Sequence, residues 1–291
     1  MIKNFYKLLF LLLIICSCKK EISLVSTDFT TENEFTAGIE GPAVDNNGNL
    51  YAVNYKEEGT IGIIDKKGNA SLFVTLPNGS IGNGIRFDKN NNMFIADYVN
   101  HNILMIKNGE KKVQIFASDS TLNQPNDLAI SPNGTLYASD PNWANETGKL
   151  WMVKNNTFIL LEATMGTTNG IEVSPDGNTL YVNESVQRRI WKYSISEDGS
   201  LKNKTLFTSF TNFGLDGMRC DAKGNLYVCR YGKGTVAVFN SGGTLLREIQ
   251  LKGKKPTNIS FGGAANKQCF VTVADRGIIE TFFAEHPGRS F

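Results

Sequence analysis

The chain has 291 residues, of which 41% are hydrophobic and 20% are charged, and its formal net charge is +2. This balance excludes a disordered polymer and a polytopic membrane protein, and it predicts a globular fold. Because the sequence has no long basic block, we expect no nucleic acid partner.

The first 17 residues have the composition of a targeting segment. Lys3 and Lys7 precede an apolar run, 8–15, that is too short to span a bilayer as a helix. Ser17 then stands directly before Cys18. The segment resembles the signal peptide of bacterial lipoproteins, which implies cleavage after Ser17 and a lipid on Cys18. An ordinary secretory peptide is the alternative.

Both interpretations of this segment take the folded part out of the cytoplasm. We therefore expect an exported lipoprotein of the bacterial cell envelope, periplasmic or surface-facing, that meets the membrane only through a lipid anchor at Cys18. Residues 18–30 are polar and without period, which predicts a lipidated tether, and the folded domain is expected at 31–291. Loss of 1–17 removes two lysines and no acid, so the mature chain is electrically neutral.

Cysteine and histidine are scarce beyond the tether. The remaining thiols are Cys220, Cys229 and Cys269, an odd number, and the imidazoles are His101 and His286. We expect no structural disulfide and no zinc or iron–sulfur site.

From residue 40 onward, six segments repeat one plan: an acid or amide, an alternating strand, a turn rich in glycine or asparagine, and a second strand. Their leading residues, which we call the repeat heads, lie 43, 43, 43, 47 and 42 positions apart: Glu40, Asn83, Asn126, Asn169, Asp216 and Asn258. Two further strands follow in the first five units. Four short strands per period of this length are typical of a propeller blade. The sequence predicts an all-β, six-bladed β-propeller with four-stranded blades.

The last unit has only three strands before the chain ends. We therefore expect the N-terminal segment 30–36 to pair as the outer strand of the last blade and close the ring.

The repeat heads begin the strands that surround a propeller axis, so we expect their oxygens to converge. Carboxylates and amides without a nearby thiol or imidazole suit a hard cation, and Ca²⁺ tolerates the irregular geometry best. Another divalent cation is possible. Simple turn chemistry is the alternative explanation of the Asn-Gly and Asp-Gly pairs, above all for Asn83 and Asn258.

Four motifs carry a family resemblance: EGP at Glu40, QPNDLAISPNGTLYASDP around Asn126, NGIEVSPDGNTLYVNES around Asn169 and GLDGMRCDAKGNLYV around Asp216. The chain resembles the gluconolactonase and regucalcin (senescence marker protein) family of six-bladed propellers over residues 36–285. The resemblance implies a calcium ion held by Glu40, Asn126, Asn169 and Asp216, and hydrolysis of a lactone. Gln124 stands where sugar-lactonase relatives often have an arginine, so a sugar acid is not implied.

A lactone carbonyl bound to Ca²⁺ is more open to attack by water. Asp216 is the predicted catalytic residue, as the general base toward that water. The alternative is that Asp216 is a ligand only and that metal-bound water is the nucleophile.

We expect the substrate to be a small lactone or sugar-derived molecule. Its binding residues are expected among two repeat heads and the loops that follow the second strands: Asn83, His101, Trp143, Glu184, Arg230, Tyr231 and Asn258. Two other functions stay open: a non-catalytic propeller that binds a carbohydrate or protein, and a phosphotriester or other ester hydrolase on the same metal centre.

Overall fold

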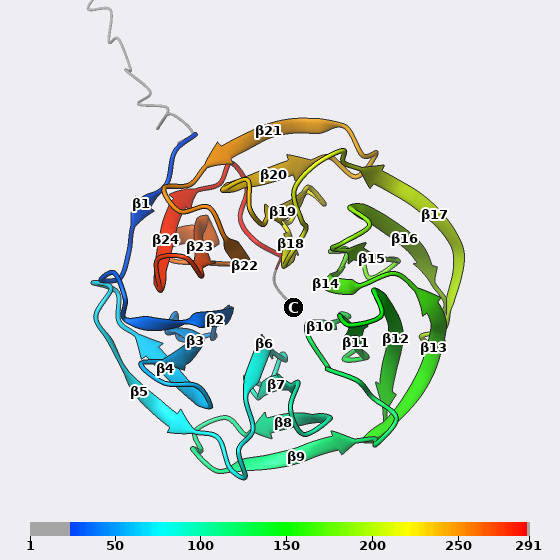
Figure 1. Ribbon diagram of the computed structural model, residues 1–291, viewed down its shortest axis with the longest axis horizontal. Helices are drawn as coiled ribbons and strands as arrows, with labels where there is room; N and C mark the ends of the chain where they lie inside the picture. Colours follow the sequence, from blue (N-terminus) through cyan, green and yellow to red (C-terminus); the bar gives the residue numbers. More distant parts are fainter. Residues whose placement is uncertain (1–23, 290–291) are drawn as a thin grey trace, which may run out of the picture.

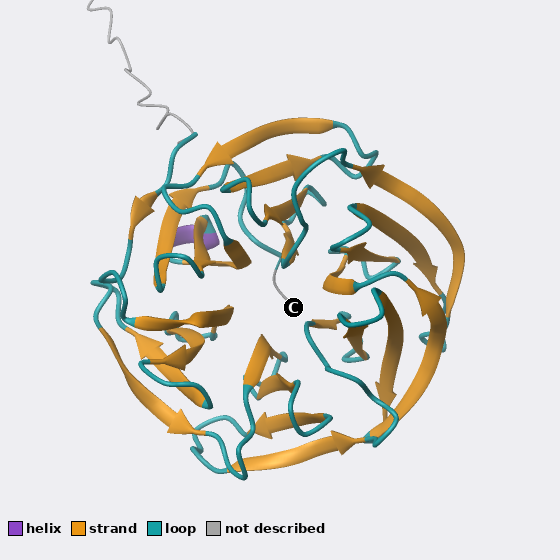
Figure 2. Cartoon of the chain, in the orientation of Figure 1, coloured by secondary structure: helices purple, strands orange, loops and turns teal. Residues whose placement is uncertain are grey.

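A computed structural model describes residues 24–289 of the chain, so the predicted signal peptide, the lipidation site at Cys18 and the first part of the tether lie outside the described residues. Six four-stranded antiparallel sheets surround a central axis (Figure 1). This confirms the predicted six-bladed propeller. The one helix within residues 24–289 is the short 3₁₀ turn η1 (Ala264–Asn266), as Figure 2 shows. None of the described segments is a helix long and apolar enough to cross a membrane.

Each blade runs from an inner strand near the axis to an outer strand at the rim (Figure 1). Blade 1 consists of β2 (Phe35–Val44), β3 (Leu50–Tyr55), β4 (Thr60–Ile64) and β5 (Ala70–Thr75). Blade 2 consists of β6 (Gly82–Phe87), β7 (Met93–Asp97), β8 (Asn102–Ile106) and β9 (Val113–Ser118). Blade 3 consists of β10 (Leu128–Ile130), β11 (Leu136–Asn142), β12 (Thr147–Lys154) and β13 (Thr157–Met165).

The second half of the ring repeats the plan. Blade 4 consists of β14 (Thr168–Val173), β15 (Thr179–Glu184), β16 (Arg189–Ile195) and β17 (Leu201–Ser209). Blade 5 consists of β18 (Met218–Cys220), β19 (Leu226–Arg230), β20 (Thr235–Phe239) and β21 (Leu245–Gln250). Blade 6 consists of β22 (Pro256–Gly262), β23 (Gln268–Val273), β24 (Ile278–Phe283) and the N-terminal strand β1 (Thr27–Asp28).

The ring is closed by the N-terminal segment, but not by the residues that the sequence indicated. β1 pairs antiparallel with β24, with Thr27 opposite Thr281 and Asp28 opposite Glu280. Residues 27 and 28 belong to the predicted tether, and the expected segment 30–36 instead turns inward, so that Phe35 already begins β2. The expected segment cannot pair at the rim because the residues between 28 and 35 connect the outer edge of blade 6 to the inner strand of blade 1 (Figure 1).

The hydrophobic core lies between neighbouring blades rather than inside any one of them. Both faces of a blade are covered, and alternate side chains of a strand enter the two adjacent layers. Val53 and Ile61 of blade 1, for example, pack with Ile85 and Ile95 of blade 2, and all four are fully buried. The cysteines Cys220, Cys229 and Cys269 are free thiols within these layers. This packing joins each blade to its neighbours around the axis, where the repeat heads lie.

The C-terminal segment crosses one end of the central channel. Gly288 pairs with Asp221, and the amide of Arg289 donates to the carbonyl of Cys220 at 3.3 Å. In Figure 1 this red segment runs from blade 6 toward the axis. The two ends of the channel are therefore built differently.

Candidate functional site

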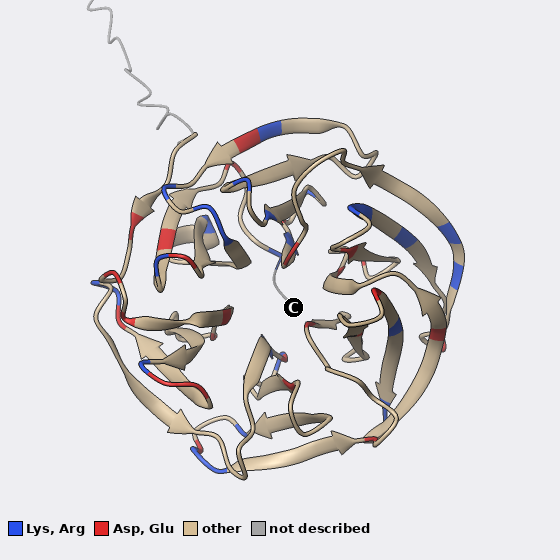
Figure 3. Ribbon diagram, viewed as in Figure 1, with Lys and Arg blue, Asp and Glu red and all other residues tan. Residues whose placement is uncertain are grey.

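Five of the six repeat heads line one cavity of about 460 Å³ on the propeller axis: Glu40, Asn83, Asn126, Asn169 and Asp216. Figure 3 shows acidic segments at the axial end of β2 and beside β18. The predicted convergence of these residues is therefore present. We call this space the axial cavity.

The glycine that follows four of the repeat heads is required by close packing at the axis. Gly41 has a left-handed φ of 56°, and a Cβ there would lie 2.1 Å from the carbonyl oxygen of Asn83 in the next blade. A Cβ on Gly217 would lie 2.0 Å from the Asn258 side chain, and Gly84 and Gly170 are crowded in the same way. The Asn-Gly and Asp-Gly pairs thus let neighbouring inner strands approach, which simple turn chemistry does not explain.

Glu40 is held firmly at the wall of the cavity. Its Oε2 accepts hydrogen bonds from the Gly41 amide at 2.6 Å and from Asn258 Nδ2 at 3.0 Å. Burial raises the pKa of Glu40, and the nearby carboxylate of Asp127 raises it further, because both disfavour the charged form. An ionised Glu40 therefore needs a positive partner.

Asp216 lines the same cavity from blade 5 and lies in a similar environment. Burial, followed by the charge of Glu40, raises its pKa well above the ordinary value for an aspartate. Hydrogen bonds from the Asn169 side chain and the Gly217 amide oppose this rise without cancelling it. Asn183 Nδ2 fixes the Asp216 backbone through a 2.6 Å bond to its carbonyl oxygen. Two buried carboxylates that repel one another in the same cavity favour a cation between them.

Two amide oxygens complete the arrangement. Oδ1 of Asn126 and Oδ1 of Asn169 are buried, and neither has a hydrogen-bond partner among the described residues. An unsatisfied buried acceptor is costly unless a donor or cation reaches it. Residues 24–289 contain no cluster of three His, Cys, Asp or Glu side chains, so a metal here would rely on amides as well as carboxylates. The four oxygen-bearing residues fit a hard cation.

Asn258 differs from the other repeat heads, and the prediction that it binds substrate does not fit its contacts. It is 1% exposed and does not line the axial cavity. Its Nδ2 donates to Glu40, and its Oδ1 accepts from the Ile259 amide at 2.9 Å. With both ends of its amide occupied, Asn258 positions Glu40.

The outer wall of the cavity is partly aromatic. Trp143 and Tyr231 line it, as predicted, together with the repeat head Asn83. The cavity lining also includes Asn54, Tyr98, Gln124, Ser185 and Thr257. Asn54 lies near the end of the second strand β3, and Tyr98 and Ser185 directly follow the second strands β7 and β15, where the repeat pattern predicts the cavity wall.

His101, Glu184 and Arg230 do not line the axial cavity. Arg230 is 2% exposed, stacks on the Phe210 ring and donates to the Asn212 carbonyl at 2.6 Å. Glu184 accepts a hydrogen bond from the Gly166 amide at 2.8 Å. These contacts commit both side chains to neighbouring loops, which is why neither reaches the axis. His101 has a left-handed φ of 57° and a buried Nδ1.

Comparison with known proteins places this site in context. Residues 39–275 match the family described as "SMP-30/Gluconolactonase/LRE-like region". The chain is 26% identical over 303 residues to the diisopropyl-fluorophosphatase of Loligo vulgaris, covering 92% of this chain and 96% of that protein. It is 27% identical over 206 residues to the gluconolactonase of Zymomonas mobilis, covering 62% of this chain and 57% of the other.

Among solved structures, the chain is similar to regucalcin from Agrobacterium tumefaciens, described as a calcium-binding protein. The TM-score is 0.75 at 21% identity, and the match covers 90% of this chain and 98% of regucalcin. At this identity the likeness establishes the shared propeller fold.

Proposed function

Because the chain belongs to the SMP-30/gluconolactonase/LRE-like family, we propose that it is a hydrolase that opens a lactone ring with the help of a divalent cation, Ca²⁺ in the first instance. The lactonases among its relatives support this reaction class. The observation that carries the proposal is the pair of unsatisfied amide oxygens, on Asn126 and Asn169, in the same cavity as the two buried carboxylates of Glu40 and Asp216.

These four residues would hold the cation. When bound there, it would polarise the lactone carbonyl and stabilise negative charge on the carbonyl oxygen. Glu40 and Asp216 would supply two negative charges, and the amides of Asn126 and Asn169 would supply neutral oxygens. The Asn258 hydrogen bond keeps Glu40 in place during the reaction.

Asp216 is the residue that we assign to proton transfer. It lies at the cavity wall, and burial raises its pKa, which makes it a better proton acceptor than an exposed aspartate. Its carboxylate would remove a proton from the attacking water while Asn169 and Gly217 hold it in position. The alternative, in which Asp216 acts as a ligand alone, predicts retained activity in a variant that still binds the cation.

The walls of the cavity favour an uncharged ring as substrate. Apart from Glu40 and Asp216, the residues that line it carry no formal charge, and they include Tyr98, Trp143 and Tyr231. Flat aromatic side chains stack on rings. A small lactone fits these surroundings.

A second function, hydrolysis of a phosphotriester, is favoured by one comparison. The match to diisopropyl-fluorophosphatase extends over 92% of this chain. The same cation site could polarise a phosphoryl oxygen in place of a carbonyl.

We also propose export and lipid attachment at Cys18. The support is the short apolar run followed by Ser17 and Cys18.

The function is tested with the purified full chain on gluconolactone, an aromatic lactone and a phosphotriester, with chelator and with added Ca²⁺. We expect acid release from a lactone that chelator abolishes and Ca²⁺ restores. Asp216→Asn should reduce kcat by about a hundredfold or more, whereas Asp198→Asn, a charge loss in an exposed turn, should not. Calcium binding without turnover of any substrate would instead indicate a non-catalytic binding propeller.

A further inference from the structure

A second cavity, of about 430 Å³, lies on the axis at the opposite end of the channel. The inner strands that begin at the axial cavity end at this second cavity. In three blades the residue pairs are Glu40 at the axial cavity with Val44 here, Asn83 with Arg86, and Asp216 with Arg219. None of the described residues lines both cavities. We call this second space the arginine cavity.

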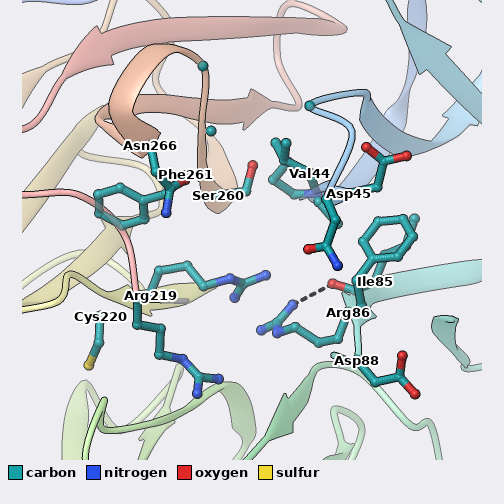
Figure 4. A pocket seen from close by; sticks show the side chains of 18 of the residues that line it. Val44, Asp45, Ile85, Arg86, Asp88, Arg219, Cys220, Ser260, Phe261 and Asn266 are labelled. Carbon is teal, nitrogen blue, oxygen red and sulfur yellow. Dashed lines mark hydrogen bonds between the residues drawn. The ribbon is translucent and has the colours of Figure 1, made fainter. Parts of the chain in front are cut away.

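Three arginines converge on it. Arg86 and Arg219 come from β6 and β18 and are 6% and 8% exposed. Arg289 comes from the C-terminal segment that crosses the channel. Figure 4 shows Arg86 and Arg219 reaching toward the middle of the cavity, with Ser260 also at its wall.

The buried acids nearby do not neutralise the arginines fully. Arg86 Nη2 pairs with Asp127 Oδ1 at 3.0 Å, and Arg289 Nε pairs with Glu172 Oε1 at 2.5 Å. Arg219 has only long contacts to the same two acids, 3.9 Å to Asp127 and 4.0 Å to Glu172. Of the three arginines, Arg219 is therefore the one without a close acidic partner.

Residues that line this cavity also carry donors without acceptors. Arg86 Nε, Arg219 Nη2 and Ser260 Oγ are buried and have no hydrogen-bond partner within the described part of the chain. Another nitrogen of Arg219, Nη1, does have acceptors. It donates to the Met218 carbonyl at 2.7 Å and to Asn258 Oδ1 at 3.4 Å. Buried guanidinium donors that lack acceptors are uncommon, because each costs free energy.

We propose that the arginine cavity binds a phosphate group, either inorganic phosphate or the phosphate of a monoester. Arginines that come from several sides, together with a hydroxyl, match the tetrahedrally arranged oxygens of phosphate better than the planar oxygens of a carboxylate. Lys89 adds a further positive charge to the lining. Three acids also line the cavity: Asp45, Asp88 and Glu172. Asp45 accepts the backbone amides of Asn47 and Asn49, Asp88 accepts those of Asn90 and Asn92, and Glu172 pairs with Arg289, so each carboxylate has partners of its own.

The test uses the full chain and inorganic phosphate, titrated by calorimetry and followed by thermal melting, with sodium chloride at matched ionic strength as the blank. We expect phosphate to bind and to raise the melting temperature, since a ligand of the native state stabilises it. Arg219→Gln should abolish this binding, and Ser260→Ala should weaken it by about tenfold. Arg247→Gln, at an arginine paired with Glu285 on the rim, is the matched control and should bind normally.

Binding no stronger than the chloride blank, or equal binding by wild type and Arg219→Gln, would overturn the proposal. If Arg219→Gln does not fold, the phosphate affinity of Ser260→Ala tests the proposal instead, because this variant loses only a hydroxyl and should fold. Phosphate affinity unchanged in that variant would then contradict the assignment. Inorganic phosphate and glucose 6-phosphate titrated in parallel show whether the site takes the free anion or a monoester. None of these readouts depends on lactone hydrolysis.

Discussion

Asn258 Nδ2 donates a 3.0 Å hydrogen bond to Glu40 Oε2, and this contact joins the last blade to the first at the propeller axis. The two residues are 218 positions apart in the chain. The geometry of the candidate cation site therefore depends on correct closure of the ring.

Asn258→Ala should weaken calcium binding. Loss of a hydrogen bond to a charged group costs about 1.5–3 kcal/mol, so we expect calcium affinity to fall by roughly ten- to a hundredfold. Calorimetric titration with Ca²⁺ measures it. Asn145→Ala, in an exposed loop, is the control. Equal affinity in both variants would show that Asn258 does not position Glu40.

Gly41→Ala should destabilise the fold more than an ordinary change at a left-handed glycine. Gly48→Ala is the matched control, since Gly48 has a φ of 82° but a Cβ added there would meet no heavy atom within 4 Å. The control should lose about 1–2 kcal/mol for backbone conformation alone. Gly41→Ala adds the clash with the Asn83 carbonyl and should lose clearly more. Urea unfolding compares them, and equal losses would contradict close packing at the axis.

Stabilisation by calcium should grow as the pH rises. Without a cation, burial raises the pKa of Glu40 to about 7, so the folded state holds protons that the unfolded state has already lost. Stability in chelator should therefore fall as the pH rises from the ordinary glutamate range through about 7. Calcium must displace these protons, so its added stability should be small at about pH 5 and large at about pH 8.

Thermal melts with chelator and with Ca²⁺ at several pH values measure this difference. Glu40→Gln should reduce the pH dependence of the stabilisation by calcium, whereas Asp198→Asn should leave this pH dependence unchanged. A calcium effect that is independent of pH would argue against the buried carboxylates as ligands.

Trp143→Ala should impair substrate binding more than chemistry. Trp143 is 42% exposed at the cavity wall, so its loss should leave the fold intact. We expect KM to rise by about five- to tenfold with kcat within about twofold, because stacking stabilises bound substrate and transition state alike. Leu160→Ala, an exposed position on the outer strand of blade 3, should change neither constant. A fall in kcat at constant KM would assign Trp143 a different role.

Cys18→Ala should release the protein from membranes when the full chain is produced in a bacterium. The lipid would be attached to the thiol, so the variant should lack the added mass in mass spectrometry and leave the detergent phase. Cys16→Ala alters a neighbouring cysteine and should remain lipidated. A lipid-free wild-type protein would favour an ordinary secretory peptide.

The architecture could be predicted from the repeat because every blade has the same order of strands and turns and packs in the same way against its neighbours. It also indicated Glu40, Asn126, Asn169 and Asp216, since the start of an inner strand has one place in a propeller. The bond from Asn258 to Glu40 could not be predicted, because a single sequence does not show which neighbour an amide will bond. The stacking of Arg230 on Phe210 lies outside the repeat, so the sequence contained no signal for it. Arg289 lies beyond the last repeat, so its place in the channel had no signal.

The closing strand β1 gives the ring a mechanical weak point. Only two residue pairs join it to β24, and Arg276 reinforces them through Asp28, Glu32 and Glu280. A pulling force applied at the N-terminal end would first load the backbone bonds of Leu24 and Ser26 to Gln250, and then the two pairs of β1. Detachment of β1 would leave the outer edge of blade 6 uncovered. Under load, the seam of the ring is therefore where opening would begin.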